Sequence, residues 1–300
     1  MKTEVVCIGQ AVIDCITRGR EEDSFQKNVY RAESITLSTG GDAANEAFNL
    51  AAMGRKVRLV CGLGEDTAGM LMLDEAKRRG VDTSFITVSP TLQTPVANLM
   101  VNRDGSRSSV NSRATMLGDY APAEDVVKGA KIVSLASLFR APLDKKEVIE
   151  ALVRSAKAEG AVVCADTKLP TYRKLCLEDL KDILPLIDYM FPNENEGAYY
   201  TGETRLMEMA EKIRSYGVKN VVIKAGEKGC AACGEKEQFF MDSLPVKAVD
   251  SSGAGDSFVS GFLSALLDGK GFRECCAAGT KYAADCVQRV GAVAPVRRQR

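Results

Sequence analysis

Short apolar runs alternate with longer amphipathic segments along most of the chain. Six of the runs have the composition of strands buried on both faces, and they occupy residues 5–8, 57–61, 132–135, 161–165, 187–191 and 221–225. The spacing of apolar residues predicts helices at about 43–53, 68–79, 144–159, 203–216, 253–268 and 272–287. This alternation predicts an α/β fold in which helices cover both faces of a mostly parallel sheet. There is no internal repeat and no long linker, so we expect a single domain over residues 1–300.

Two further pairs of segments have the alternating pattern of β ribbons. They pair residues 12–17 with 34–37, and residues 96–101 with 107–111. Asp104-Gly105, between the last two segments, is a strong hairpin signal. We expect these ribbons, at about 12–37 and 96–111, to form a small sheet that covers one edge of the domain. Such a sheet could be a lid that excludes water from a reaction, or only a peripheral hairpin.

The charge balance and the apolar pattern narrow the class of protein. Lys and Arg number 40, as do Asp and Glu, so the formal net charge is zero and we expect no nucleic-acid partner. No apolar run approaches membrane-spanning length, so we expect no membrane partner. The N-terminal residues lack the features of a secretory signal, which favours a cytoplasmic protein.

The cysteines and the missing histidines narrow the chemistry. The ten cysteines lie mostly in apolar runs, which favours reduced, buried thiols over disulfides. Cys230-x-x-Cys233 has metal or redox spacing, but it has no second pair and the chain has no histidine, so a zinc site is disfavoured. Hydrolase mechanisms that need histidine are excluded as well. A general base must therefore be a carboxylate, a lysine or another side chain.

Residues 250–256 (DSSGAGD) lead into an apolar helix face that begins at Phe258. The unpaired N–H groups at a helix start favour anions, and Asp256 brings a carboxylate into the same turn. A base beside an anion-binding helix start suits phosphoryl transfer from a nucleotide to an alcohol. The same pattern is also typical of a plain capped helix whose acids complement the helix dipole.

Four other glycine or acidic stretches have both a functional and an ordinary structural interpretation. Gly40-Gly41-Asp42 with Asn45 could admit a ligand and hydrogen-bond its hydroxyl groups, or could be a simple strand-to-helix turn. Glu196, in 193–196 (NENE), could hold magnesium directly or through water, or could complement a helix dipole. Residues 224–229 (KAGEKG) could admit a phosphate, although the P-loop order is missing. Residues 62–69 depart from the dinucleotide fingerprint and predict a turn and a helix start.

In this order the stretches resemble the ribokinase-like, phosphofructokinase B family of carbohydrate kinases over nearly the whole chain. The likeness rests on Gly40-Gly41-x-x-x-Asn45, Asn193-x-x-Glu196, Gly226-x-x-Gly229 and residues 250–256, the last with Ser251 where the family has threonine. The resemblance implies a three-layer α/β/α sandwich with a small β-sheet lid. It also implies an ATP-dependent, magnesium-requiring kinase that phosphorylates a sugar hydroxyl, and a homodimer formed through the lid.

The resemblance further implies a role for each matching residue. Asp256 would be the base, with the N–H groups of Gly253, Ala254 and Gly255 as the anion hole. The sugar would contact Asp14, Gly41, Asp42 and Asn45, and the nucleotide would contact Asn193, Lys224, Gly226, Gly229 and Thr280. Glu196 would lie near hydrated magnesium, and Asp250, with the Gly291 loop, resembles the site of a monovalent cation such as K⁺ in some members.

Departures from the family pattern bear on the substrate. Residues 166–170 (DTKLP) resemble the D-x-N-x-R element of fructose and ketodeoxygluconate kinases, but lysine replaces asparagine and proline replaces arginine. The arginine that would meet an acidic sugar is therefore missing, and Arg107, Arg140 and Lys168 are candidates to replace it. Asp42 would repel a nearby carboxylate, so we expect a neutral sugar or a polyol-like substrate. Lys224-Ala225-Gly226 and Thr280 also depart from the common pattern on the nucleotide side.

Three other functions remain to be separated from a sugar kinase. A nucleoside kinase of the same fold is disfavoured by the absence of Trp and the 6% aromatic content, because its pocket must stack a base. A catalytically silent sugar-binding regulator is disfavoured because Asp256 and its glycine nest are intact. An NAD-linked dehydrogenase is disfavoured because neither 62–69 nor 253–255 has the dinucleotide fingerprint.

Overall fold

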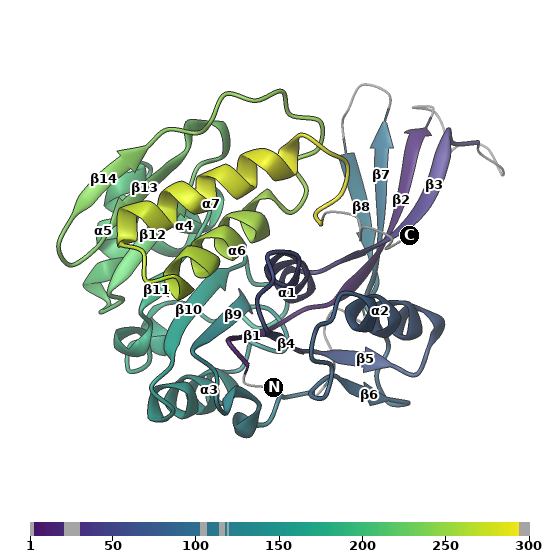
Figure 1. Ribbon diagram of the computed structural model, residues 1–300, viewed down its shortest axis with the longest axis horizontal. Helices are drawn as coiled ribbons and strands as arrows, with labels where there is room; N and C mark the ends of the chain where they lie inside the picture. The colour runs from purple at the N-terminus through teal and green to yellow at the C-terminus, as the bar shows by residue number, and fades with distance from the viewer. Residues whose placement is uncertain (1–2, 21–30, 103–106, 114–117, 119, 294–300) are drawn as a thin grey trace.

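A mostly parallel sheet of eight strands forms the centre of the molecule (Figure 1). The computed structural model describes residues 3–20, 31–102, 107–113, 118 and 120–293. In spatial order the strands are β14 (Gln238–Met241), β13 (Cys230–Cys233), β12 (Asn220–Lys224), β11 (Tyr189–Met190), β10 (Val162–Thr167), β9 (Ile132–Leu138), β1 (Val5–Ile8) and β4 (Val57–Val60). All neighbours pair in parallel except β12 with β13 and β13 with β14. The predicted parallel sheet is confirmed.

Helices cover both faces of this sheet, as the sequence predicted. One layer contains α1 (Asp42–Ala52), α2 (Thr67–Arg78), α6 (Ala254–Leu267) and α7 (Phe272–Val287). The other contains α3 (Lys146–Ala158), α4 (Glu194–Thr201) and α5 (Leu206–Ser215). Because successive side chains of a strand point to opposite faces, β1 serves both layers. Cys7 packs with Phe48 and Phe262 on one face, whereas Ile8 packs with Leu152 on the other.

A second sheet of four strands stands beside α1 and α2 (Figure 1). Its order is β3 (Ser34–Gly40), β2 (Val12–Arg20), β7 (Val96–Asn102) and β8 (Arg107–Asn111). Both predicted ribbons are present as antiparallel pairs, and β2 joins them by pairing in parallel with β7. We call this sheet the lid sheet. No helix among the described residues has the length and apolar character needed to cross a bilayer.

The structure contains elements that the sequence did not predict, among them α4, β5, β13 and β14. Gly62–Gly64 forms a short strand, β5, where the sequence predicted a turn, and it pairs in parallel with β6 (Thr87–Ser89). A Cβ on Gly64 would lie 2.7 Å from the carbonyl oxygen of Leu92, so this residue is glycine because the chain passes too closely for a side chain. Cys230 and Cys233 lie in the unpredicted strand β13, between β12 and β14, where both are buried and free of disulfides.

Candidate active site

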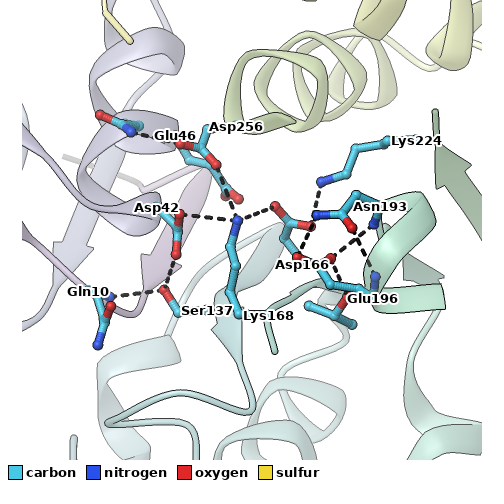
Figure 2. A network of polar contacts seen from close by, with 12 residues as sticks. Gln10, Asp42, Glu46, Ser137, Asp166, Lys168, Asn193, Glu196, Lys224 and Asp256 are labelled. Atoms are coloured by element: carbon cyan, nitrogen blue, oxygen red, sulfur yellow. Dashed lines mark hydrogen bonds and ion pairs between the residues drawn. The ribbon is translucent and has the colours of Figure 1, made fainter. Parts of the chain in front are cut away.

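The predicted catalytic side chains meet where the strands of the central sheet end (Figure 2). The carboxyl ends of parallel strands are where ligands bind in open α/β sheets. Asp166 is the second-last residue of β10, and Lys224 is the last residue of β12. The first turns of α1 and α6 bring Asp42 and Asp256 to the same edge. Four elements that are distant in sequence therefore build one cluster of charges.

The start of α6 has the backbone that the anion-hole prediction requires. Gly253 is the N-cap and has a φ of 71°, and a Cβ there would overlap Ala292, so glycine is needed for both reasons. Ala254 is the first helical residue, and its N–H donates to the carbonyl of Ser251 at 3.3 Å. That long bond engages one of the three predicted donors within its own turn. The helix dipole still directs positive potential at this end of α6.

Asp256 is buried in the first turn of α6, with 5% of its surface exposed. Its Oδ2 accepts a hydrogen bond from Asn45 Nδ2 at 2.7 Å, and its Oδ1 lies 3.8 Å from Lys168 Nζ. Burial and the charge of Asp42 raise the pKa of Asp256 to about 7, while Lys168 and Asn45 act in the opposite direction. A carboxylate with a pKa near neutral pH is well matched to proton abstraction at that pH.

The residues predicted to contact substrate hydroxyl groups lie at the start of α1. Gly41 has a φ of 90°, and a Cβ there would lie 2.6 Å from the carbonyl oxygen of Gln10. The segment that follows β1 passes very close to the start of α1, which explains the paired glycines. Asp42 is oriented by Ser137, whose Oγ donates to Asp42 Oδ2 at 3.1 Å and accepts from the backbone N–H of Gln10 at 3.2 Å. Asn45 points instead toward the base, as described above.

Asp14 approaches the same region from the lid sheet. It lies on β2, where a Cβ on Gly40 of the neighbouring strand would overlap its carboxylate. Burial and the charge of Asp42 raise the pKa of Asp14 to about 6. The predicted sugar-binding residues Asp14, Gly41, Asp42 and Asn45 therefore converge on one place. Arg107 begins β8, but its side chain lies outside the described part of the structure.

Lys168 lies at the centre of the cluster, a role that the sequence did not predict. Its Nζ lies 3.2 Å from Asp42 Oδ1, 3.7 Å from Asp166 Oδ2 and 3.8 Å from Asp256 Oδ1 (Figure 2). Burial alone would lower the pKa of Lys168, but the three carboxylates raise it well above its usual value. The lysine is therefore a cation at neutral pH. In the sequence, Lys168 stood out only because it replaces the asparagine of the D-x-N-x-R pattern.

The predicted nucleotide-side residues divide into two groups. Lys224 Nζ pairs with Asp166 Oδ1 at 2.6 Å and would lie 3.3 Å from a Cβ on Gly255, so it reaches the predicted anion hole. Gly226 has a φ of 58° with open space where a side chain would be. Gly229, in contrast, packs so closely on the backbone of 241–243 that glycine is explained by packing. Thr280 is buried, with its Oγ1 3.6 Å from Met241 Sδ.

Comparison with known proteins agrees with this geometry. The pfkB family of carbohydrate kinases matches residues 2–299. The chain belongs to this family. It is 27% identical over 267 residues to a ribokinase of Haemophilus influenzae, covering 87% of this chain and 84% of the relative. It is 28% identical over 260 residues to a cytidine kinase of Thermococcus kodakarensis, covering 84% and 88% of the two chains.

The fold comparison points the same way. The structure of an Arabidopsis thaliana ribokinase complexed with ribose and ATP superposes with a TM-score of 0.80 at 27% identity, covering 97% of this chain and 95% of that one. The predicted family and the three-layer α/β fold are thus confirmed, and the chain is an ATP-dependent carbohydrate kinase.

Glu196 of this kinase is a structural cap with little capacity for direct metal binding. It accepts from Asn193 N at 2.9 Å, from Asn193 Nδ2 at 2.7 Å and from Thr167 Oγ1 at 2.9 Å, while Asn193 caps α4 in return. A carboxylate has about four lone-pair sites, so roughly one remains for another donor. That capacity fits a water molecule of a hydrated magnesium ion. The described residues contain no group of three or more acidic or cysteine side chains arranged to hold a metal.

The carboxylate of Asp250 lies beside the guanidinium of Arg18. Its carboxylate accepts from Ser252 N at 2.9 Å and Gly291 N at 3.1 Å, and its Oδ2 lies 3.5 Å from Arg18 of the lid sheet. Burial would raise the pKa of Asp250, but these hydrogen bonds and Arg18 lower it below its usual value. The guanidinium supplies positive charge at the carboxylate where the sequence resemblance implied a monovalent cation.

A cavity of about 700 Å³ separates the lid sheet from the loop that leads into α6. Ile16, Arg18 and Leu99 line it from the lid sheet, and Asp250 and Ser252 line it from the loop. The cavity is thus bounded by residues next to the predicted base and anion hole on one side and by the predicted lid on the other.

Proposed function

We propose that this kinase transfers the γ-phosphoryl group of ATP to a hydroxyl of a neutral sugar, with Asp256 as the general base. The observation that carries the proposal is the buried Asp256 carboxylate, whose pKa is raised to about 7, in the first turn of α6. As the acceptor oxygen attacks phosphorus, Asp256 takes its proton. The N–H groups of residues 253–255 stabilise the charge that develops on the transferred group.

The nucleotide would lie on the side of Lys224 and the open turn at Gly226. Lys224, paired with Asp166 and close to Gly255, is placed to meet the phosphate charge as it approaches the anion hole. When it is bound with ATP, magnesium neutralises part of the phosphate charge. The remaining acceptor site of Glu196 would hold a water of that ion, and Asn193 would hold Glu196 in place.

A neutral acceptor follows from the charges on the sugar side. Asp14, Asp42 and Asp256 all face this region, and Lys168 is already paired with Asp42 and Asp256. A substrate carboxylate would add another negative charge beside the aspartates, which is unfavourable in a buried site. Lys168 therefore does not replace the missing arginine of the acidic-sugar kinases.

The outer face of the lid sheet supports the predicted homodimer. Ile35 and Leu37 of β3 and Val110 of β8 are 67%, 62% and 62% exposed. The strand registers place them on one face, because Leu37 pairs with Cys15, and Cys15 and Val110 both pair with Asn98. Large apolar side chains exposed together favour burial against a partner, and a second copy would present the same patch.

A nucleoside kinase is the second candidate, favoured by the likeness to the cytidine kinase. The cavity below the lid sheet argues against it, since the described residues that line it include no aromatic ring. We would test both with a panel of neutral sugars, sugar acids and nucleosides, using ATP, magnesium and coupled detection of ADP. ADP release with neutral sugars supports the proposal. Release only with sugar acids or only with nucleosides would overturn the substrate assignment.

A further inference from the structure

A partly buried lysine joins the two sides of the active site. Lys168 contacts Asp42 and Asp256 on the sugar side at 3.2 and 3.8 Å, and Asp166 at 3.7 Å. Asp166 in turn contacts Lys224 on the nucleotide side at 2.6 Å. Figure 2 shows the ammonium of Lys168 directed into the space between the three carboxylates. The proposed base thus has a cation beside it in the protein itself.

The backbone of Lys168 is held from two directions. Its N–H donates to the carbonyl of Leu138 at 2.9 Å, and its carbonyl accepts from the hydroxyl of Tyr200 at 2.6 Å. The Tyr200 ring packs on Phe139 with 4.5 Å between centroids. Phe139 itself has a φ of 75°, which a bulky residue adopts only at an energetic cost. The surrounding structure therefore stabilises this placement of the lysine.

We propose that Lys168 is a positioning residue for phosphoryl transfer, whose ammonium keeps the carboxylate of Asp256 ionised and oriented toward the acceptor hydroxyl. The inference rests on the proposed function, because it takes Asp256 as the base. In the reaction the acceptor O–H bond breaks while its oxygen bonds to phosphorus, the proton moves to Asp256, and ADP leaves with the electron pair. Lys168 keeps its proton throughout. An opposite charge within about 4–6 Å favours the ionised form of a carboxyl group.

Asp42 and Lys168 have opposing effects on the base. The titratable groups that surround Asp256 are Asp42 and Glu46 of α1, Asp166 and Lys168 at the end of β10, Lys224 of β12 and Cys286 of α7. Burial and nearby Asp166 raise the pKa of Glu46 well above its usual value, and burial raises that of Cys286. Asp42 raises the pKa of Asp256 and Lys168 lowers it. Replacing each should therefore move the pH dependence in opposite directions.

The test is the pH dependence of kcat for Lys168→Met and Asp42→Asn, measured with a sugar that the wild-type enzyme phosphorylates. We expect the acidic limb of Lys168→Met to move upward by about 1 pH unit, which lowers turnover about tenfold on that limb. The limb of Asp42→Asn should move downward. Lys168→Arg, which keeps the charge, should bring the limb back toward its wild-type position even if its bulk lowers the maximum.

Lys157→Met is the matched control. Lys157 lies away from the site, where its Nζ is 2.7 Å from Asp188 Oδ2, so this substitution should leave the limb unmoved. A purely structural role for Lys168 would lower kcat equally at all pH values, and an unmoved limb in Lys168→Met would overturn the proposal. If Lys168→Met does not fold, Lys168→Arg and Asp42→Asn decide the question, and a limb that stays in place in Asp42→Asn overturns it. A wild-type enzyme that phosphorylates no sugar at any pH would instead refute the proposed function.

Discussion

Replacing Asp256 by asparagine should make the protein more stable at neutral and alkaline pH while it removes activity. The carboxylate is buried, and burial together with Asp42 raises its pKa from 3.8 to about 7. Asparagine has the same shape, and its amide oxygen can still accept from Asn45, which donates to Asp256 at 2.7 Å. Lys168 would keep its contacts with Asp42 and Asp166, so the substitution leaves no unpaired cation.

The size of the effect follows from proton linkage. Between pH of about 4 and 7 the folded chain holds a proton on Asp256 that the unfolded chain has released, so wild-type stability falls as pH rises through this window. A pKa raised by about 3 corresponds to about 4 kcal/mol at 1.36 kcal/mol per unit. This is the expected gain of Asp256→Asn above pH 7, since the raised pKa already includes the attraction to Lys168 that the variant loses. Below pH of about 4 the two proteins should be equally stable.

The assay is the free energy of unfolding in urea at several pH values for the wild type and Asp256→Asn. Asp188→Asn is a control of opposite sign. Burial would raise the pKa of Asp188, but its hydrogen bonds to Lys157, Lys219 and the backbone lower it below its usual value. Loss of that charge should cost about 1–3 kcal/mol at neutral pH. A stability difference between wild type and Asp256→Asn that does not grow between pH 5 and 8 would refute the electrostatic reasoning.

Three other substitutions test separate parts of the site. Gly253→Ala should lower the free energy of unfolding by about 1–3 kcal/mol and lower kcat, because the residue has a φ of 71° and a side chain would overlap Ala292. A wild-type free energy of unfolding in urea and a wild-type kcat would contradict this. Wild-type turnover should not depend on K⁺, whereas Arg18→Gln, which removes the guanidinium beside Asp250, should be activated by K⁺; a wild type that requires K⁺ would show that Arg18 does not serve this role. Glu196→Gln should raise the magnesium concentration needed for half-maximal turnover about tenfold, and equal magnesium titrations for variant and wild type would argue against the water-mediated contact.

Most of the fold could be predicted because its signals are local. The six buried strands and the lid ribbons each have a distinct apolar pattern within a few residues. β13 escaped prediction because its sequence, Cys230–Cys233 (CAAC), is small, buried throughout and without alternation. α4 has no strong apolar face, and it begins where Asn193 and Glu196 cap each other. The parallel pairing of β2 with β7 joins two ribbons that carry no local signal for each other.

The site was partly predictable for a similar reason. The motif at residues 250–256 pointed to Asp256, but the contact that orients it comes from Asn45, 211 residues earlier. Lys168 was visible only as a departure from a family pattern. Its contacts depend on how β10, α1 and α6 come together, and the spacing of residues along the chain does not contain that information. The burial that raises the pKa of Asp256 is likewise a property of the assembled layers.

The most direct test of Asp256 as the base of a sugar kinase is a product measurement with wild type and Asp256→Asn side by side. Each is incubated with ATP, magnesium and the best neutral sugar, and sugar phosphate and ADP are both quantified, with nucleotide binding measured separately. The wild type should form the two products in equal amounts. Asp256→Asn should bind ATP normally and turn over at least about 10²-fold more slowly. Equal rates for the two proteins, or ADP formed without sugar phosphate by the wild type, would contradict the account.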